Sequence, residues 1–112
     1  MLDTNFLIEA EKRRVLDDAR AALPGAKLVT LSPVMAELEK QGHKLALEIV
    51  KKESIDVLPA KGYADDAIAE YAAAHKSAVA TNDKALTERL RAKGIGVLYP
   101  KNRGCGFLGA AE

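Results

Sequence analysis

The feature that most constrains the fold is an alternation of short β-type runs with longer helical stretches along all 112 residues. Helical patterns cover residues 6–23, 32–40, 43–52, 64–75 and 83–93, and strand patterns cover residues 27–31, 55–58, 77–81 and 96–99, after a first strand that ends at residue 2. Strands separated by helices predict a parallel sheet with right-handed crossovers. We therefore expect an α/β fold, a three-layer α/β/α sandwich with a central parallel sheet.

Proline and glycine mark the expected ends of several elements. Pro24-Gly25 closes the first helical stretch, and Ser32 followed by Pro33 is typical of a helix N-cap with proline at the first helical position. The tail after Tyr99 is rich in glycine and has no clear periodic pattern. We expect one domain over residues 1–99 and a C-terminal tail over residues 100–112, whose structure the sequence leaves open.

Composition excludes several classes of protein. With 48% hydrophobic and 29% charged residues, the chain is globular rather than disordered. No apolar run approaches the roughly 20 residues of a membrane-spanning helix, so we expect no membrane association. The single cysteine, Cys105, can form neither an internal disulfide nor a zinc cage, which favours a reducing cytoplasm. The net charge of +1 argues, taken alone, against a strongly basic nucleic-acid-binding protein.

Acidic residues stand at the expected strand ends. Asp3 directly follows the first strand, and Asp83 follows the fourth strand with one residue between. Ligands of doubly wound folds collect beyond the carboxyl ends of the strands, where the strand order reverses. If that order is 3-2-1-4-5, Asp3 and Asp83 face one crevice. The helices after the second and third strands then bring Glu37 and Asp65-Asp66 towards it, so carboxylates from four separated segments converge.

Such a cluster requires a cation, because carboxylates in a partly buried site repel one another and raise each other's pKa. Oxygen ligands without cysteine or histidine suit Mg²⁺ or Mn²⁺ rather than zinc, and a divalent ion at this place indicates phosphoryl-transfer chemistry. Each residue alone also has a structural explanation. Asp3 and Asp83 are good helix N-caps, Glu37 fits a solvated helix face, and Asp65-Asp66 complement a helix dipole. Their shared location at strand ends favours the site.

Four runs of residues, in order, resemble the motifs of PIN-domain nucleases. They are residues 3–8, 32–40, 64–68 and 80–86, and the resemblance spans residues 2–99. Residues 35–40, 63–66, 80–83 and 95–99 are most similar to the branch that processes the precursor of small-subunit ribosomal RNA, whose archaeal relatives are small stand-alone domains. VapC-type toxins share the fold and the acidic set, so a toxin ribonuclease is the alternative.

The resemblance implies a metal-dependent endoribonuclease with the strand order 3-2-1-4-5. Its catalytic residues and ligands for one or two Mg²⁺ or Mn²⁺ ions would be Asp3, Glu37, Asp65 and Asp83. Asp65 is preferred to Asp66 because it lies three residues before Ile68, which should face the sheet. Asn5, Thr81 and Asp66 are expected to orient the carboxylates.

Charge is unevenly distributed along the chain. Residues 84–103 contain six basic residues and one acidic residue, whereas residues 1–83 carry a net negative charge. A basic stripe beside an acidic pocket suits RNA cleavage, and we expect it to bind the RNA backbone through Lys84, Arg89, Arg91 and Lys93. A solvated helix face is the alternative for these residues. The net charge of +1 therefore does not exclude nucleic acid.

Two departures from the family pattern stand out. A full first strand carries several apolar residues before the aspartate, and here only Leu2 follows Met1, so the strand is short or the recorded start lies downstream of the true one. The tail from residue 100 matches no motif firmly. The expected partner is a structured ribosomal RNA precursor, with an antitoxin under the toxin alternative and a homodimer as a further expectation. A non-catalytic scaffold that binds RNA or protein is the remaining alternative.

Overall fold

A computed structural model of the chain describes residues 1–109, which form six helices and five strands. The helices are α1 (Thr4–Ala10), α2 (Val15–Ala22), α3 (Ser32–Lys40), α4 (Lys44–Lys52), α5 (Ala64–His75) and α6 (Lys84–Ala92). The strands are β1 (Val29–Leu31), β2 (Asp56–Leu58), β3 (Val79–Ala80), β4 (Val97–Pro100) and β5 (Cys105–Leu108). The expected α/β class is confirmed. No helix in the described part of the chain has the length and apolarity needed to cross a membrane.

The strands form two small sheets rather than one continuous sheet. β1 and β2 pair in parallel, β3 and β4 pair in parallel, and β5 joins β4 in the antiparallel direction. The backbone of residues 1–3 lies between the two sheets, because the Leu2 N–H donates to the Val29 carbonyl at 2.8 Å and the Asp3 N–H donates to the Ala80 carbonyl at 3.0 Å. Only an isolated parallel bridge between Leu2 and Ala80 forms there. The first strand is as short as the sequence indicated, and it does not join the two sheets into the single parallel sheet that we expected.

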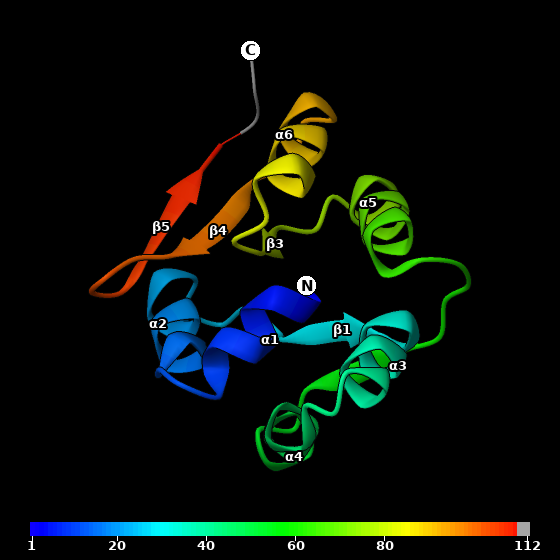
Figure 1. Cartoon of the computed structure of the whole chain (residues 1–112). Coiled ribbons are helices and arrows are strands. Elements are labelled where there is room, and N and C mark those ends of the chain that lie inside the picture. Colours follow the sequence, from blue (N-terminus) through cyan, green and yellow to red (C-terminus); the bar gives the residue numbers. More distant parts are fainter. Residues whose placement is uncertain (110–112) are drawn as a thin grey trace.

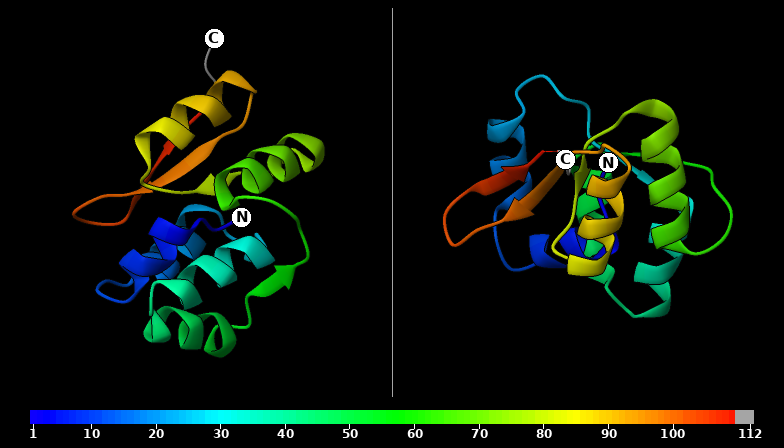
Figure 2. Two further views of the ribbon diagram at one scale, coloured as in Figure 1. Left: turned by 45° about the vertical axis from the view of Figure 1, so that its right-hand side comes forward. Right: turned by 90° about the horizontal axis from the view of Figure 1, so that it is seen from above.

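The helices form two groups around the strands. Figures 1 and 2 show α5 and α6 together on one side of the molecule and α1, α2, α3 and α4 on the other, with β1 and β3 between them. The amino terminus lies near the centre of the molecule in both figures. This arrangement brings the residues that follow residue 2 and β3 close to the first turns of α5 and α6.

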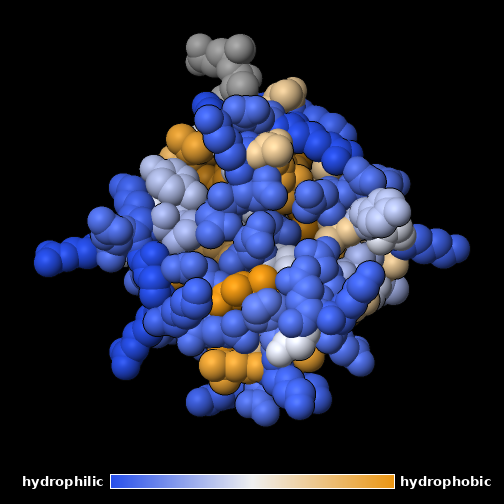
Figure 3. Space-filling view, in the orientation of Figure 1, coloured by the Kyte–Doolittle hydropathy of each residue, from blue (hydrophilic) through white to orange (hydrophobic). Residues whose placement is uncertain are grey.

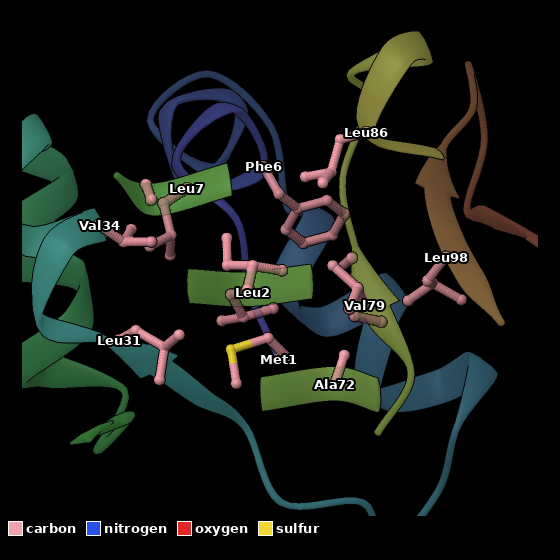
Figure 4. Close-up of a cluster of buried hydrophobic side chains, with 14 of the residues drawn as sticks. Met1, Leu2, Phe6, Leu7, Leu31, Val34, Ala72, Val79, Leu86 and Leu98 are labelled. Carbon is pink, nitrogen blue, oxygen red and sulfur yellow. The ribbon is translucent and has the colours of Figure 1, made fainter. Parts of the chain in front are cut away.

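The hydrophobic core surrounds the short N-terminal segment. Leu2 and Phe6 are almost completely buried, and Figure 4 shows Leu2 between Leu31 on one side and Val79 on the other. The face of the molecule in Figure 3 is mostly hydrophilic, with small apolar patches. Core packing therefore holds residues 1–3 in place although they form little regular strand.

The predicted helix over residues 6–23 is wrong in one respect, because residues 11–14 form a turn between α1 and α2. In one continuous helix, Leu7 and Leu16 would lie on opposite faces, nine residues or about 180° apart at about 100° per residue. Both side chains are buried in the core, and the turn makes this arrangement possible.

The predicted N-cap role of Ser32 is also wrong. α3 begins at Ser32 with Leu31 in the cap position and no side-chain cap. The Ser32 hydroxyl instead accepts the Ala60 N–H at 3.0 Å and donates to the Ala60 carbonyl at 3.2 Å. This contact ties the start of α3 to the segment that follows β2.

The glycine-rich tail contains a strand that the sequence pattern did not reveal. β5 forms a hairpin with β4, in which the Phe107 ring covers Gly96 and the Tyr99 ring covers Gly106. A Cβ atom at either glycine would collide with the ring opposite, so these glycines make room for cross-strand aromatic packing. The remainder of the expected tail, residues 110–112, lies outside the described residues.

Candidate metal and nucleic-acid site

One polar cleft of about 440 Å³ gathers residues from four separated segments of the chain. It is lined by Asp3, Thr4, Asn5, Glu37, Tyr63, Ala64, Asp65, Asp66, Asp83 and Arg89. The four carboxylates expected to act together, those of Asp3, Glu37, Asp65 and Asp83, are all among them. They come from the segment after residue 2, the middle of α3, the first turn of α5 and the residue before α6.

Asp3 is the most deeply buried carboxylate of the cleft, at 2% exposed. Its Oδ1 accepts the Thr4 N–H at 2.7 Å, and its Oδ2 accepts the Thr81 hydroxyl at 2.6 Å. Burial raises the pKa of Asp3 from 3.8 to about 6, the negative charges of Asp65 and Asp83 add to this, and the two hydrogen bonds oppose it. The fold thus holds a carboxylate whose ionisation has to be compensated.

Asp83 is both a helix cap and a member of the cluster. Its side chain caps α6, because Oδ1 accepts the Leu86 N–H at 2.9 Å. Its own N–H donates to the Thr81 Oγ1 at 3.0 Å, so the Thr81 hydroxyl connects Asp83 to Asp3. Capping and membership of the cluster are therefore compatible roles of the same residue.

The first turn of α5 presents its two aspartates differently. Desolvation raises the pKa of Asp65, as do the charges of Asp83 and Asp66, whereas Arg89 lowers it. Both aspartates are exposed, and the Oδ1 of Asp66 accepts a hydrogen bond from the Arg89 guanidinium at 2.7 Å. Electrostatically, Asp65 belongs with Asp3 and Asp83, while Asp66 holds an arginine beside them.

The acidic side chains share a cleft but do not meet at one point. Across residues 1–109, no three carboxylate, histidine or cysteine side chains lie close enough together to hold a metal ion as they stand. Carboxylates repel one another, which opposes closer approach without a cation. The expected convergence is therefore on one cleft, with Glu37 and Asn5 contributing to its walls.

The chemistry of these residues fits a hard divalent cation such as Mg²⁺ or Mn²⁺. All candidate ligands are oxygen atoms, and the buried Asp3 needs compensation for its charge. Thr4 also lines the cleft, and its buried Oγ1 lacks a hydrogen-bond partner among the described residues. An unpaired buried hydroxyl of this kind is costly unless a ligand or water completes its hydrogen bonding.

The four expected RNA-binding residues lie at different places relative to the cleft. Arg89 lines it, whereas Lys84 is exposed at the first position of α6 and Lys93 follows the end of that helix. The Arg91 Nε donates to the Gly109 carbonyl at 2.8 Å. The basic stripe thus shares one helix, but within residues 1–109 only Arg89 takes part in lining the cleft.

Sequence reasoning missed Tyr63, which lines the cleft and is 83% exposed. The sequence motif of residues 63–66 includes it, but aromatic residues are more often buried, and no periodic pattern marks this loop residue as exposed. The position of Tyr63 depends on the path of the segment between β2 and α5.

Comparisons with known proteins agree with this architecture. The sequence profile described as "PIN like domain" matches residues 1–103. Ribonuclease VapC4 of Methanocaldococcus jannaschii is 34% identical, over 90% of this chain and 88% of that protein. The solved structure of the PIN domain endonuclease Utp24 superposes with a TM-score of 0.85 and 35% identity, over 99% of this chain and 92% of that one. The chain belongs to the PIN-like domain family.

Proposed function

We propose that the protein is a metal-dependent endoribonuclease that cleaves phosphodiester bonds in the acidic cleft. The observation that carries this proposal is the gathering of Asp3, Glu37, Asp65 and Asp83 in one cleft from four segments of the chain. Two relatives support it, since one is called a ribonuclease and the other an endonuclease.

Asp3, Glu37, Asp65 and Asp83 would hold one or two Mg²⁺ or Mn²⁺ ions. Bound there, a divalent ion supplies Lewis-acid stabilisation of the phosphate and lowers the pKa of an attacking water. Thr81 orients the Asp3 carboxylate by donating to it, and the same hydroxyl accepts the Asp83 backbone N–H. Asn5 lies beside Asp3 in the wall of the cleft. Asp66 keeps the Arg89 guanidinium at the cleft by an ion pair.

The RNA backbone is the second ligand of the proposed site. The Arg89 guanidinium donates to Asp66 through Nη1, and its other N–H groups are suited to phosphate oxygens. Lys84, Arg91 and Lys93 lie on or next to the same helix and extend the positive charge along it. A substrate strand would thus run along α6 with its scissile phosphate at the carboxylates.

The biological substrate that we favour is a structured ribosomal RNA precursor. This choice rests on the motifs of residues 35–40, 63–66, 80–83 and 95–99, which are most similar to those of the branch that processes ribosomal RNA. It also rests on the match to Utp24, which covers nearly the whole of both chains. A VapC-type toxin is the second candidate, because the VapC4 relative is similar at nearly the same identity. The toxin role predicts an antitoxin gene directly upstream and growth arrest on expression that this neighbour relieves, and the ribosomal role predicts neither.

We further propose a reducing cytoplasm as the compartment, since Cys105 is a free thiol. A homodimer is the expected assembly. Analytical ultracentrifugation of the purified protein tests the assembly, and a single species at the monomer mass contradicts it.

Cleavage of a structured RNA by the purified protein tests the proposed activity. We expect cleavage with Mg²⁺ or Mn²⁺, and at least about a hundredfold loss of rate in Asp3→Asn and Asp83→Asn, because each removes one negative oxygen from the ion's surroundings. Asp17→Asn is the matched control, since Asp17 lies exposed on α2 away from the cleft. If both cleft variants cut as fast as the control, the nuclease proposal is wrong and a scaffold role takes its place.

A further inference from the structure

The exposed aromatic ring of Tyr63 lies at the acidic cleft, and the proposed cleavage of RNA assigns it no role. Tyr63 is 83% exposed, compared with 53% for Phe107, 49% for Leu45 and 41% for Val57, the other large hydrophobic residues that the described chain leaves exposed. Tyr63 also lines the cleft together with Asp65 and Asp66. An aromatic ring left in water contributes little to folding, so packing does not explain this ring.

The backbone that carries Tyr63 is fixed on both sides. Tyr63 has an extended backbone at the N-cap of α5, and its carbonyl accepts the Ala67 N–H at 2.9 Å. Three residues earlier, both backbone polar groups of Ala60 are held by the Ser32 hydroxyl. The short loop between these points is therefore anchored, and it presents an exposed ring from a fixed position.

A positively charged side chain, that of Arg89, lines the same cleft as this ring. Arg89 from α6 reaches the first turn of α5, where its guanidinium is held by Asp66 at 2.7 Å. A planar ring offers a face on which any nucleobase can stack, and a guanidinium offers donors for a phosphate. One nucleotide carries both groups, so the cleft offers complementary contacts to a nucleotide beside the carboxylates.

We propose that Tyr63 stacks on an unpaired base next to the scissile phosphate, while Arg89 binds the backbone of the same strand. This inference rests on the proposed nuclease function and makes Tyr63 the residue that selects RNA that is single-stranded at the cut. A base inside a duplex is covered on both faces by its neighbours and cannot stack on a side chain. A structured substrate would then be cut in a loop, a bulge or a single-stranded end.

Cleavage kinetics on two forms of one RNA test the proposal. The probe is a short RNA oligonucleotide, used alone and annealed to its complement, with kcat and KM measured for the wild type, Tyr63→Ala, Tyr63→Phe and Leu45→Ala. We expect Tyr63→Ala to lower kcat/KM on the single strand about 5- to 100-fold, because stacking on an aromatic ring is lost. Tyr63→Phe should retain the wild-type value, since phenylalanine keeps the ring, and Leu45→Ala removes an exposed apolar side chain of α4 outside the cleft. The wild type should prefer the single strand, and Tyr63→Ala should lose most of that preference.

A binding measurement separates failure of this inference from failure of the proposed function. The same oligonucleotide is labelled with 2-aminopurine, whose fluorescence is quenched by stacking. Its fluorescence is measured on binding to the Asp83→Asn variant, with and without Tyr63→Ala, in the presence of Mg²⁺. Quenching that disappears with Tyr63→Ala supports the stacking role even if the wild type cuts no RNA. If the wild type cuts RNA but Tyr63→Ala shows unchanged kinetics, quenching and strand preference, the stacking proposal is wrong and the nuclease proposal stands.

Discussion

At the scale of single residues, the cleft depends on a carboxylate that the fold keeps in an unfavourable environment. Asp3 is buried, its two oxygens are hydrogen bonded, and two further carboxylates raise its pKa. Structural ion pairs also perturb pKa values, but the pKa of Asp3 is set by burial, by the Thr81 hydroxyl and Thr4 amide, and by the negative charges of two carboxylates, with no cationic side chain of residues 1–109 among these causes. The ionised Asp3 carboxylate therefore lowers the stability of the free protein, and a bound cation would offset this cost.

This arrangement predicts how the stability of the metal-free protein depends on pH. The pKa of Asp3 is about 6 in the folded state against a reference of 3.8, so the folded protein binds the proton more tightly. The stabilisation linked to this proton is complete below pH 3.8 and is lost as the pH rises through 6, by about 3 kcal/mol at most. In EDTA at pH 7, Asp3→Asn should therefore unfold at a higher urea concentration than the wild type. The difference should shrink towards pH 4, and a difference that is constant with pH contradicts the account.

A second prediction concerns the Thr81 hydroxyl, which connects the Asp3 carboxylate to the Asp83 backbone N–H. Thr81→Val keeps the shape of the buried side chain but removes the donor to Asp3 Oδ2 and the acceptor of the Asp83 N–H. Because this hydroxyl lowers the pKa of Asp3, its loss should shift the pH profile of cleavage to higher pH and reduce the rate about 10- to 100-fold. Thr81→Ser should restore both.

The control for this change is Thr30→Val. Thr30 is equally buried, and its hydroxyl donates to the Leu2 carbonyl at 2.8 Å outside the cleft. Both valine variants lose a buried hydrogen bond, so both should lose stability. A shifted pH profile in Thr30→Val, or an unshifted one in Thr81→Val, counts against a positioning role for Thr81.

The gathering of the four carboxylates in one cleft could be predicted at this scale, because topology sets the places of the residues after strands and in the helices that follow them. Asp3 follows residue 2, Asp83 follows β3 by three residues, and Asp65 lies in the first turn of the helix after β2. Contacts that depend on the direction of long side chains could not be predicted. The pairing of Asp66 with Arg89 and the exposure of Tyr63 are set by the packing of α5 against α6 and by the loop before α5.

At the scale of elements, a side chain from one helix caps another. The Glu11 carboxylate, at the end of α1, accepts the Ala46 N–H in the first turn of α4 at 3.0 Å and lies 3.1 Å from the His43 Nδ1. A carboxylate at a helix N-terminus satisfies a free N–H and interacts favourably with the helix dipole. The contact also fixes α1 relative to α4.

Removal of this carboxylate should destabilise the protein. We expect Glu11→Ala to lower the free energy of unfolding by about 1–2 kcal/mol, as the loss of a helix cap does. Glu39→Ala is the matched control, since Glu39 is exposed near the end of α3. Equal urea midpoints for the two variants would show that the cap contributes nothing.

Helices and strands could be predicted from the sequence where local residue patterns set their bounds. They could not be predicted where contacts between distant residues set them. α5 has the expected bounds, because its apolar residues keep the helical period over residues 64–75. The turn at residues 11–14 depends on burying Leu7 and Leu16 in one core, and β5 depends on a glycine opposite an aromatic ring. Both depend on residues well separated in the sequence, so no short stretch of sequence predicts the turn or β5.

At the scale of the whole molecule, opposite charges are separated along the chain. The net charge of +1 combines a negative segment, residues 1–83, with a basic segment, residues 84–103. The fold brings the two together at the cleft, where carboxylates of the first segment, Asp83 among them, lie beside Arg89 of the second. A metal bound at the carboxylates would make the cleft more positive than the sequence count indicates. A nearly neutral net charge therefore does not exclude binding of a polyanion at the cleft.

We propose that the carboxylates of this cleft form the metal site of a ribonuclease. The rate of RNA cleavage along a Mn²⁺ titration tests it most directly, measured with the wild type and with Asp83→Asn after removal of all metal by EDTA. We expect no cleavage without metal, a rate that rises to saturation with Mn²⁺, and at least about a hundredfold lower saturating rate in the variant. Cleavage that persists in EDTA, or an identical titration curve for Asp83→Asn, would contradict it.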